Sequence, residues 1–307
     1  MSEKNLPKII AVVGPTASGK SELALYLAQA LGGEIICTDS MQVYQKMDIG
    51  TAKPTAAEQA LIPHHQLDLV KPDAHYSAGC YERDVGNILK RLHKQNKPAI
   101  LVGGTGLYFR CTVFGICQIP EIPPEIKEEV NAWHEQGLGK CFEKLQELDP
   151  VSSSKLHKND TARILRALEV VLHTGQSIQS YQQEHGFKTP KYSVFSVAYR
   201  HERENLYHLI NQRTHVMLNA GLVEEVRALL EEYPPTLIPL QAIGYFQVVQ
   251  YLENRMKIEE MVEKIQQKTR NYAKRQLNWF KNDEEIRWFS YGEKKPILNQ
   301  VKSFLDS

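Results

Sequence analysis

The stretch that most constrains this chain is a phosphate loop near its N-terminus, with the sequence Gly14-Pro15-Thr16-Ala17-Ser18-Gly19-Lys20-Ser21. The two glycines let the backbone turn so tightly that successive N–H groups can point at one anion. Lys20 adds a positive charge for phosphate oxygens, and the Ser21 hydroxyl is suited to a Mg²⁺ ion that bridges two phosphates. The loop therefore predicts a site for a phosphorylated ligand.

The sequence on both sides of the loop supplies the context that such a site needs. Residues 8–13 form an apolar run typical of a buried strand, and residues 20–31 repeat leucines every four positions, as an amphipathic helix does. A phosphate would then lie at a helix N-terminus, where free N–H groups and the helix dipole favour negative charge. A chance glycine turn is the alternative, and it leaves the flanking strand and helix unexplained.

Alternating strands and helices predict the fold class, an α/β protein with a P-loop NTPase-like core in which helices flank a parallel sheet. Residues 34–37 and 98–102 are predicted as further buried strands. The second of these runs into Gly103-Gly104-Thr105-Gly106, where an ATPase or GTPase of the phosphate-loop class usually carries an acidic residue for Mg²⁺. The site is therefore predicted to hold phosphates without the usual equipment for hydrolysis on this strand.

Three prolines, at positions 120, 123 and 124, mark a change in the sequence pattern. No strand-like run follows until about Tyr192, and the intervening sequence has helical patterns. We therefore predict a P-loop-like core formed by residues 1–119 and 191–307, and an all-helical subdomain inserted at 120–190. The last long helix is predicted at about 258–280, with Ile258, Met261, Ile265, Tyr272 and Leu277 in the core.

Composition and cysteine usage favour a cytoplasmic protein without membrane contact. Hydrophobic residues make up 42% of the chain, yet no apolar run approaches the roughly 20 residues that span a bilayer. The first eight residues, MSEKNLPK, lack the apolar stretch of a signal peptide. None of the five cysteines forms a C-x-x-C pair, which favours reduced thiols over disulfides or structural zinc. The adjacent His64 and His65 are expected to be structural or solvent-facing, because neighbouring positions rarely aim at one metal ion.

Evidence for RNA binding must come from local basic clusters, because the net charge of the whole chain is only +1. One cluster comprises Lys155, His157, Lys158, Arg163 and Arg166. The other spans 264–281, with six basic residues, no acidic residue and interleaved aromatic side chains. Cations for phosphates and flat rings for unstacked bases are what RNA binding needs, but each cluster alone is also compatible with an ordinary solvated face.

Six motifs, taken together and in order, closely resemble the bacterial tRNA dimethylallyltransferases, also called tRNA isopentenyltransferases. The motifs are GPTASGKS, TDSMQVYQKMDIGTAKP, LVGGTGLYFR, LHKNDTARILRALEV, QAIGYFQ and KRQLNWFK, and the resemblance runs from about residue 8 to residue 288. It implies transfer of a dimethylallyl group from dimethylallyl diphosphate to the exocyclic amine of the adenosine at tRNA position 37. The products would be i6A and diphosphate. The implied partners are the tRNA anticodon stem-loop, dimethylallyl diphosphate and Mg²⁺, and a monomer is expected.

The resemblance also assigns residues. It implies that Asp39 accepts a proton from the adenine amine, that Thr105 donates to a leaving-group oxygen and that Arg213 binds the diphosphate. The metal would lie on Ser21. A structural aspartate at a strand end is the alternative for Asp39.

The implied tRNA contacts lie in five places along the chain. They are Asp39, Ser40, Met41 and Gln42; Lys127; Ala162, Arg163, Ile164, Leu165 and Arg166; Gln241, Ala242, Ile243, Gly244, Tyr245 and Phe246; and Lys274, Arg275, Gln276, Leu277, Asn278, Trp279, Phe280 and Lys281. The chain departs from the family at Gln241, Phe246 and Lys127, where arginines are expected, so a bidentate arginine contact would not survive there. Eukaryotic relatives add a zinc finger after the core, which this chain is not expected to carry.

Two other functions compete with this one. A small-molecule or nucleotide kinase would bind ATP at the same loop, but it has no use for the acid-free basic segment at 264–281. A non-catalytic RNA-binding protein with a vestigial loop would not need Lys20, Ser21, Asp39 and Thr105, all of which are present.

Overall fold

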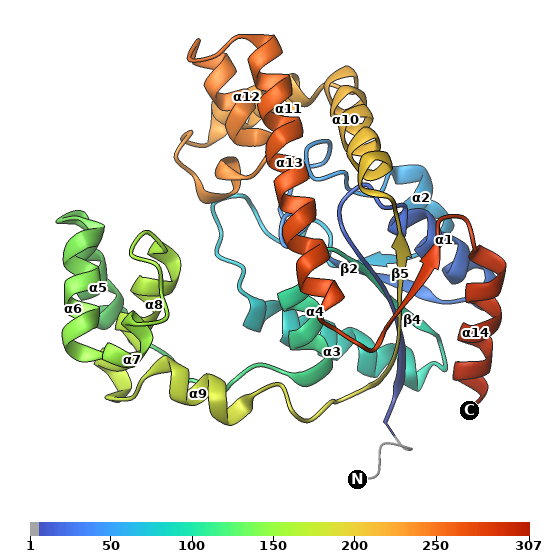
Figure 1. The fold of residues 1–307 in the computed structure, drawn as a ribbon, viewed down its shortest axis with the longest axis horizontal. Coiled ribbons are helices and arrows are strands. Elements are labelled where there is room, and N and C mark those ends of the chain that lie inside the picture. The colour runs from blue at the N-terminus through green and yellow to red at the C-terminus, as the bar shows by residue number, and fades with distance from the viewer. Residues whose placement is uncertain (1–5) are drawn as a thin grey trace. The chain divides into compact units, whose positions relative to one another are not determined.

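The computed structural model describes residues 6–307 and divides them into two compact units. The larger unit runs to Phe114 and resumes at Pro190, and the smaller unit is Gly115–Thr189 (Figure 1). The boundary falls at the glycine that precedes the proline-rich stretch, five residues before the predicted start at 120. The parts of the predicted core and of the signal-peptide expectation that fall on residues 1–5 lie outside the described residues.

The larger unit is built on a six-stranded, entirely parallel sheet in the order β3-β2-β4-β1-β5-β6. The strands are β1 (Lys8–Val13), β2 (Glu34–Thr38), β3 (His64–His65), β4 (Ala99–Gly103), β5 (Ser193–Arg200) and β6 (Ile286–Ser290). Because β4 lies between β1 and β2, Gly103 pairs in register with Val13 on one side and with Thr38 on the other. Three strands therefore end at the same level of the sheet, side by side.

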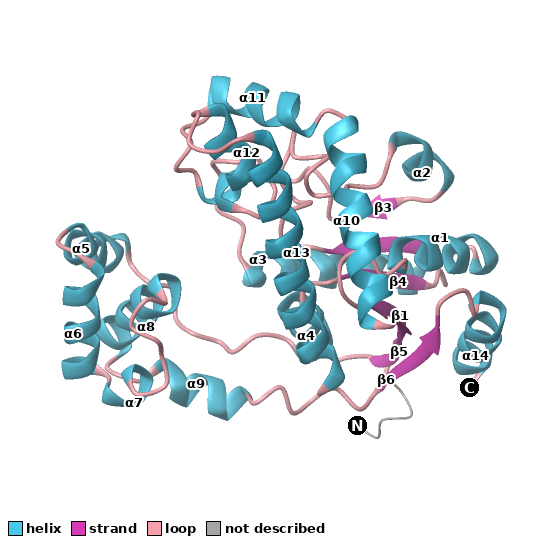
Figure 2. Cartoon of the chain, turned by 45° about the horizontal axis from the view of Figure 1, so that its top comes forward, coloured by secondary structure: helices cyan, strands magenta, loops and turns pink. Residues whose placement is uncertain are grey.

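Helices cover both faces of this sheet because successive side chains of a buried strand point to opposite faces. Ile9, Ala11 and Val13 pack with α3 (Ala78–Lys94) and α4 (Gly106–Phe114). Ile10 and Val12 pack with α1 (Lys20–Leu31) and α14 (Lys294–Asp306). Figure 2 shows this layering, with the short α2 (Ala56–Leu61) beyond β3.

A second group of helices in the larger unit has its own core. It consists of α10 (Arg203–Asn219), α11 (Leu222–Glu232), η2 (Ile238–Gln241), α12 (Tyr245–Leu252) and α13 (Ile258–Lys281). Met261 and Ile265 of α13 are buried there, as predicted, and Tyr272 and Leu277 are partly buried. Ile258 is 46% exposed, so its assignment to the core was wrong: it begins the helix, before the packed face starts.

The smaller unit is helical throughout. It contains α5 (Pro124–Glu135), α6 (Leu138–Leu148), α7 (Pro150–Ser153), α8 (Thr161–Thr174) and α9 (Ile178–His185). The Asp160 side chain accepts from the Arg163 N–H and begins α8, as an N-cap does. Val130, Cys141, Leu145 and Leu168 form a small core.

The sequence analysis missed the short β3, the strand β6 and helix α14. β6 has only five residues, of which only Ile286 is buried, so its hydrophobic pattern is weak. No helix within residues 6–307 has the length and apolar character required to cross a bilayer.

Candidate active site at the carboxyl edge of the sheet

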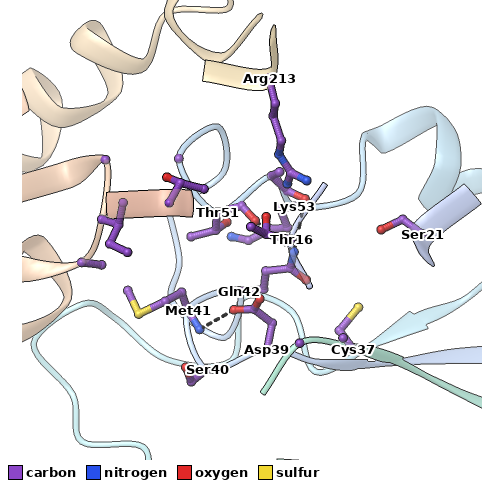
Figure 3. A pocket seen from close by; sticks show the side chains of 18 of the residues that line it. Thr16, Ser21, Cys37, Asp39, Ser40, Met41, Gln42, Thr51, Lys53 and Arg213 are labelled. Atoms are coloured by element: carbon purple, nitrogen blue, oxygen red, sulfur yellow. Dashed lines mark hydrogen bonds between the residues drawn. The ribbon is translucent and has the colours of Figure 1, made fainter. Parts of the chain in front are cut away.

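A cavity of about 460 Å³ lies beyond the carboxyl ends of β1, β2 and β4. Parallel α/β sheets place ligands at this edge. The phosphate loop, the segment after β2, the glycines after β4, and helices α10 and α13 all contribute to its wall. The lining includes Thr16, Lys20, Ser21, Asp39, Ser40, Met41, Gln42, Arg213, Tyr272 and Arg275. Figure 3 shows part of this wall, with Arg213 extending from α10 toward the side where Thr16 and Asp39 lie.

The phosphate loop has the backbone that its glycines predict. Gly14 has a φ of 140° and Gly19, which precedes the first turn of α1, has a φ of 82°. Ala17 adopts a φ of 62°, a conformation that L-residues rarely take. Strained backbone of this kind persists where the surroundings impose it and is frequent at binding sites.

Two cations and one carboxylate set the electrostatics of the cavity. Burial, and then the charge of Arg213, lower the pKa of Lys20 to about 8, while the Asp39 carboxylate opposes both effects. Burial also lowers the pKa of Arg213, again against the influence of Asp39. Lys20 Nζ donates to the Pro15 carbonyl at 3.0 Å, and neither cation forms an ion pair within residues 6–307. An anion entering the cavity would relieve the repulsion between these cations.

Asp39 is held by its neighbours in the segment after β2. Its Oδ1 accepts from the Met41 N–H at 2.8 Å, the dashed line in Figure 3, and Thr105 Oγ1 accepts from the Ser40 N–H at 3.3 Å. The local hydrogen bond is the structural role that the sequence left open for Asp39. It occupies one carboxylate oxygen, and the side chain still lines the cavity. Thr105 is not among the residues that line the cavity, so its predicted contact with the leaving group stays a prediction.

The segment from Asp39 to Pro54 is fixed at its far end by Glu225, which the sequence analysis missed. The Glu225 carboxylate accepts from the backbone N–H groups of Asp48, Ile49 and Gly50 and from the Tyr245 hydroxyl. A glutamate on an amphipathic helix gives no sequence signal of such a role. Only the fold brings α11 next to this segment.

Lys53 anchors the same segment from inside. Its side chain is only 3% exposed, and its Nζ donates to the Tyr44 carbonyl and to the carboxylates of Asp48 and Asp68. A buried amine with two carboxylate partners is a structural ion pair. Glu225 and Lys53 thus both hold the part of this segment that follows Tyr44.

A divalent cation fits this site only together with a phosphorylated ligand. Ser21 lies at the start of α1 and lines the cavity, and no cluster of three metal-ligating side chains occurs among the described residues. Mg²⁺ usually keeps several waters and binds through few protein groups plus substrate phosphates. The donor set therefore fits an ion brought by a diphosphate. His64 and His65 do not form a metal site: His64 contacts the Ile62 carbonyl, and His65 pairs with Glu34.

The residues predicted to contact tRNA differ in exposure. The side chains of Ile164, Tyr245 and Phe280 are buried in this structure, and their predicted contacts with tRNA stay predictions. Each carries the apolar face of a helix into a core. Exposed side chains in the predicted set are Lys127, Ala162, Arg163, Gln241, Phe246, Lys274, Arg275, Asn278, Trp279 and Lys281.

The fold and the loop define a phosphate-loop α/β protein. Its strand β4 runs into glycines, where ATPases and GTPases of this class usually carry a metal-binding acid. Comparison with known proteins identifies the group within that class. The sequence model of the family described as IPP transferase matches residues 42–283, and that of isopentenyl transferase matches residues 7–66.

Individual relatives agree over nearly the whole chain. The tRNA dimethylallyltransferase of Geobacter sulfurreducens is 43% identical over 286 residues, covering 92% of each chain. A tRNA dimethylallyltransferase of Syntrophus aciditrophicus is 42% identical and covers 97% of each. The chain therefore belongs to the tRNA dimethylallyltransferase family.

Solved structures give the same result. The tRNA delta(2)-isopentenylpyrophosphate transferase of Staphylococcus epidermidis is 36% identical, with a TM-score of 0.71 over 98% of this chain and 99% of that one. A eukaryotic dimethylallyltransferase, described as acting on tRNA, is 26% identical with a TM-score of 0.82, over 98% of this chain and 80% of that one.

The lowered pKa of Lys20 predicts a pH-dependent difference in stability between the wild type and Lys20→Met. The unfolded chain binds more protons than the folded one between pH 8 and 10.5, so the wild type gains stability relative to the variant across this range. The gain amounts to at most about 3 kcal/mol. Urea unfolding of both proteins at pH 7 and pH 10 measures it. If the difference in unfolding free energy between the two proteins does not change with pH, or favours the variant as pH rises, the lowered pKa of Lys20 is contradicted.

Proposed function

We propose that this protein transfers a dimethylallyl group from dimethylallyl diphosphate to the exocyclic amine of the adenosine at position 37 of tRNAs. The observation that carries the proposal is the arrangement of one carboxylate, Asp39, opposite two cations, Lys20 and Arg213, around one cavity. A base and an anion-stabilising pocket are the two elements that such a displacement needs.

In the proposed reaction, the adenine nitrogen attacks the allylic carbon that carries the diphosphate. The new bond is N–C, and the C–O bond breaks with its electron pair going to the diphosphate. The amine is a poor nucleophile because its lone pair is delocalised into the ring, so the loss of its proton must accompany attack. Asp39 accepts this proton through the carboxylate oxygen that is not bonded to the Met41 N–H.

The diphosphate gains negative charge as it leaves. Lys20, Arg213 and the N–H groups of the phosphate loop stabilise that charge in a partly desolvated site, where fixed dipoles and charges act more strongly than in water. Mg²⁺ held by the diphosphate and Ser21 would add positive charge at the same place. No water needs activation, which is consistent with the missing acid after Val102.

The tRNA would approach the exposed basic residues of α13. Lys268, Lys274, Arg275 and Lys281 are exposed, and Arg275 also lines the cavity. Adenosine 37 is stacked in the anticodon loop and must be extruded to reach the cavity. In the helical insertion, Arg163 and Arg166 remain proposed contacts; each pairs with an acid on its own helix, Asp160 and Glu169. Cytoplasmic location and a monomeric state stay predictions from the sequence.

The kinase alternative is not favoured. Its metal-binding acid is missing where β4 ends, and the relatives over nearly the full length carry the name tRNA dimethylallyltransferase. The non-catalytic alternative would leave the paired cations of the cavity without a ligand.

The decisive experiment incubates unmodified tRNA with the protein, Mg²⁺ and dimethylallyl diphosphate, and identifies the nucleosides by mass spectrometry. Gain of one dimethylallyl group on adenosine establishes the donor, the acceptor nucleoside and the reaction. ATP consumption without this gain would instead support the kinase.

The Asp39→Asn variant separates the chemical role of Asp39 from its structural one. Asparagine retains an oxygen for the Met41 N–H but accepts no proton, so single-turnover transfer should fall by about 10²- to 10⁴-fold. The dissociation constant for tRNA should stay within about threefold of the wild-type value, whereas Asp39→Ala also loses the local bond. Filter binding and rapid quench measure the two quantities. Equal losses of binding and rate would reassign Asp39 to binding.

The paired substitution Lys274→Ala and Arg275→Ala should weaken tRNA binding and flatten its salt dependence. Each lost phosphate contact lowers the slope of log K against log [salt] by about 0.7 to 0.9. Lys295→Ala with Lys302→Ala, which removes two exposed cations from α14, is the matched control and should leave the slope unchanged. An equal effect of both pairs would mean that only overall charge matters.

A further inference from the structure

One side chain of α13 holds the phosphate loop and the end of β4 together. Gln276 Oε1 accepts from the Thr16 N–H at 2.9 Å, and its Nε2 donates to the Gly104 carbonyl at 2.9 Å. The side chain is only 7% exposed although the helix is otherwise strongly polar. A buried amide that satisfies one donor and one acceptor of two different loops fixes their separation.

The contact is too close to be incidental. A Cβ built on Gly104 would lie 2.1 Å from Gln276 Nε2, and one built on Gly106 would lie 2.1 Å from Trp279 Nε1. The glycines after β4 therefore let α13 approach the strand end directly. Sequence reasoning placed Gln276 among the RNA contacts, but its side chain faces the protein interior.

Helix α13 thus has two faces with different partners. On one face, Lys274 and Arg275 are exposed and belong to the surface proposed for RNA. On the other face, Ala273 and Gln276 are buried. Arg275 also lies over the Tyr272 ring, 5.6 Å from its centroid. One rigid helix therefore connects the RNA-facing surface to the third residue of the phosphate loop.

We infer that Gln276 is a positioning residue that couples tRNA binding on α13 to diphosphate binding on the phosphate loop. This inference rests on the proposed function for the identity of the two ligands. RNA bound at Lys274 and Arg275 would fix the position of α13, and the two hydrogen bonds of Gln276 transmit that position to Thr16 and Gly104 beside the diphosphate site. By thermodynamic reciprocity, diphosphate must raise the affinity for tRNA by the same factor.

The test measures this factor with inorganic diphosphate and Mg²⁺ as the probe and with unmodified tRNA. Titration calorimetry gives the dissociation constant of diphosphate with and without saturating tRNA, and filter binding gives the reciprocal pair. We expect wild-type protein to bind diphosphate about 5- to 20-fold more tightly when tRNA is present. In Gln276→Leu the factor should fall below twofold, while the affinity for tRNA alone changes less than threefold.

Two further variants make the result specific. Gln267→Leu replaces an exposed glutamine of the same helix and should keep the wild-type factor. Gln276→Glu is nearly isosteric and retains an acceptor for the Thr16 N–H, but it loses the donor to the Gly104 carbonyl. Gln276→Glu should therefore also lose the coupling. It replaces Gln276→Leu in the test if the leucine variant does not fold.

The outcomes are distinct from those of the proposed function. Independent binding of the two ligands to the wild type, or full coupling in either Gln276 variant, would overturn the inference even where dimethylallyl transfer is observed. Absence of any tRNA or diphosphate binding by the wild type would instead contradict the proposed function.

Discussion

The site depends on one constraint, the shared level at which three parallel strands end. Because β4 pairs in register with both β1 and β2, the phosphate loop, the Asp39 segment and the glycines after β4 emerge side by side. Parallel sheets leave their strand ends free for loops in this way, since every connection must return across a face. A shift of β4 by one residue would move Gly104 away from the loop that it supports.

The charges around the cavity then determine which ligands that edge of the sheet favours. Lys20 and Arg213 are both destabilised as cations by burial, and each is partly compensated by Asp39. Two cations that repel each other in a poorly solvated cavity favour a multivalent anion. The carboxylate that partly offsets this repulsion is also the group proposed to accept the proton, so the proposal links the binding and chemical roles of the site through Asp39.

Polar side chains from helices α11 and α13 hold this arrangement. Glu225 fastens the segment after β2 through three backbone N–H groups, and Gln276 joins two loops through one amide. Buried polar groups with all partners satisfied specify one geometry, because any other arrangement leaves a donor or acceptor unpaired. The loops that carry Lys20 and Asp39 are thereby held by hydrogen bonds from residues far away in the sequence.

The sequence by itself determined the class of fold, the phosphate loop, the identity of the residues around it and the basic character of 264–281, because these follow from short-range patterns and long motifs. It did not predict the burial of Phe280, one of the aromatic side chains of the basic segment, or of Tyr245, which the family resemblance placed among the RNA contacts. It also failed at β6, a five-residue strand with one buried residue, and at α14, a helix in which only Ile297 and Val301 are buried. Only the tertiary structure decided the strand order, the role of Glu225 and the inward orientation of Gln276. These depend on contacts between residues far apart in the chain, with 260 positions separating Thr16 from Gln276, and no local pattern records them.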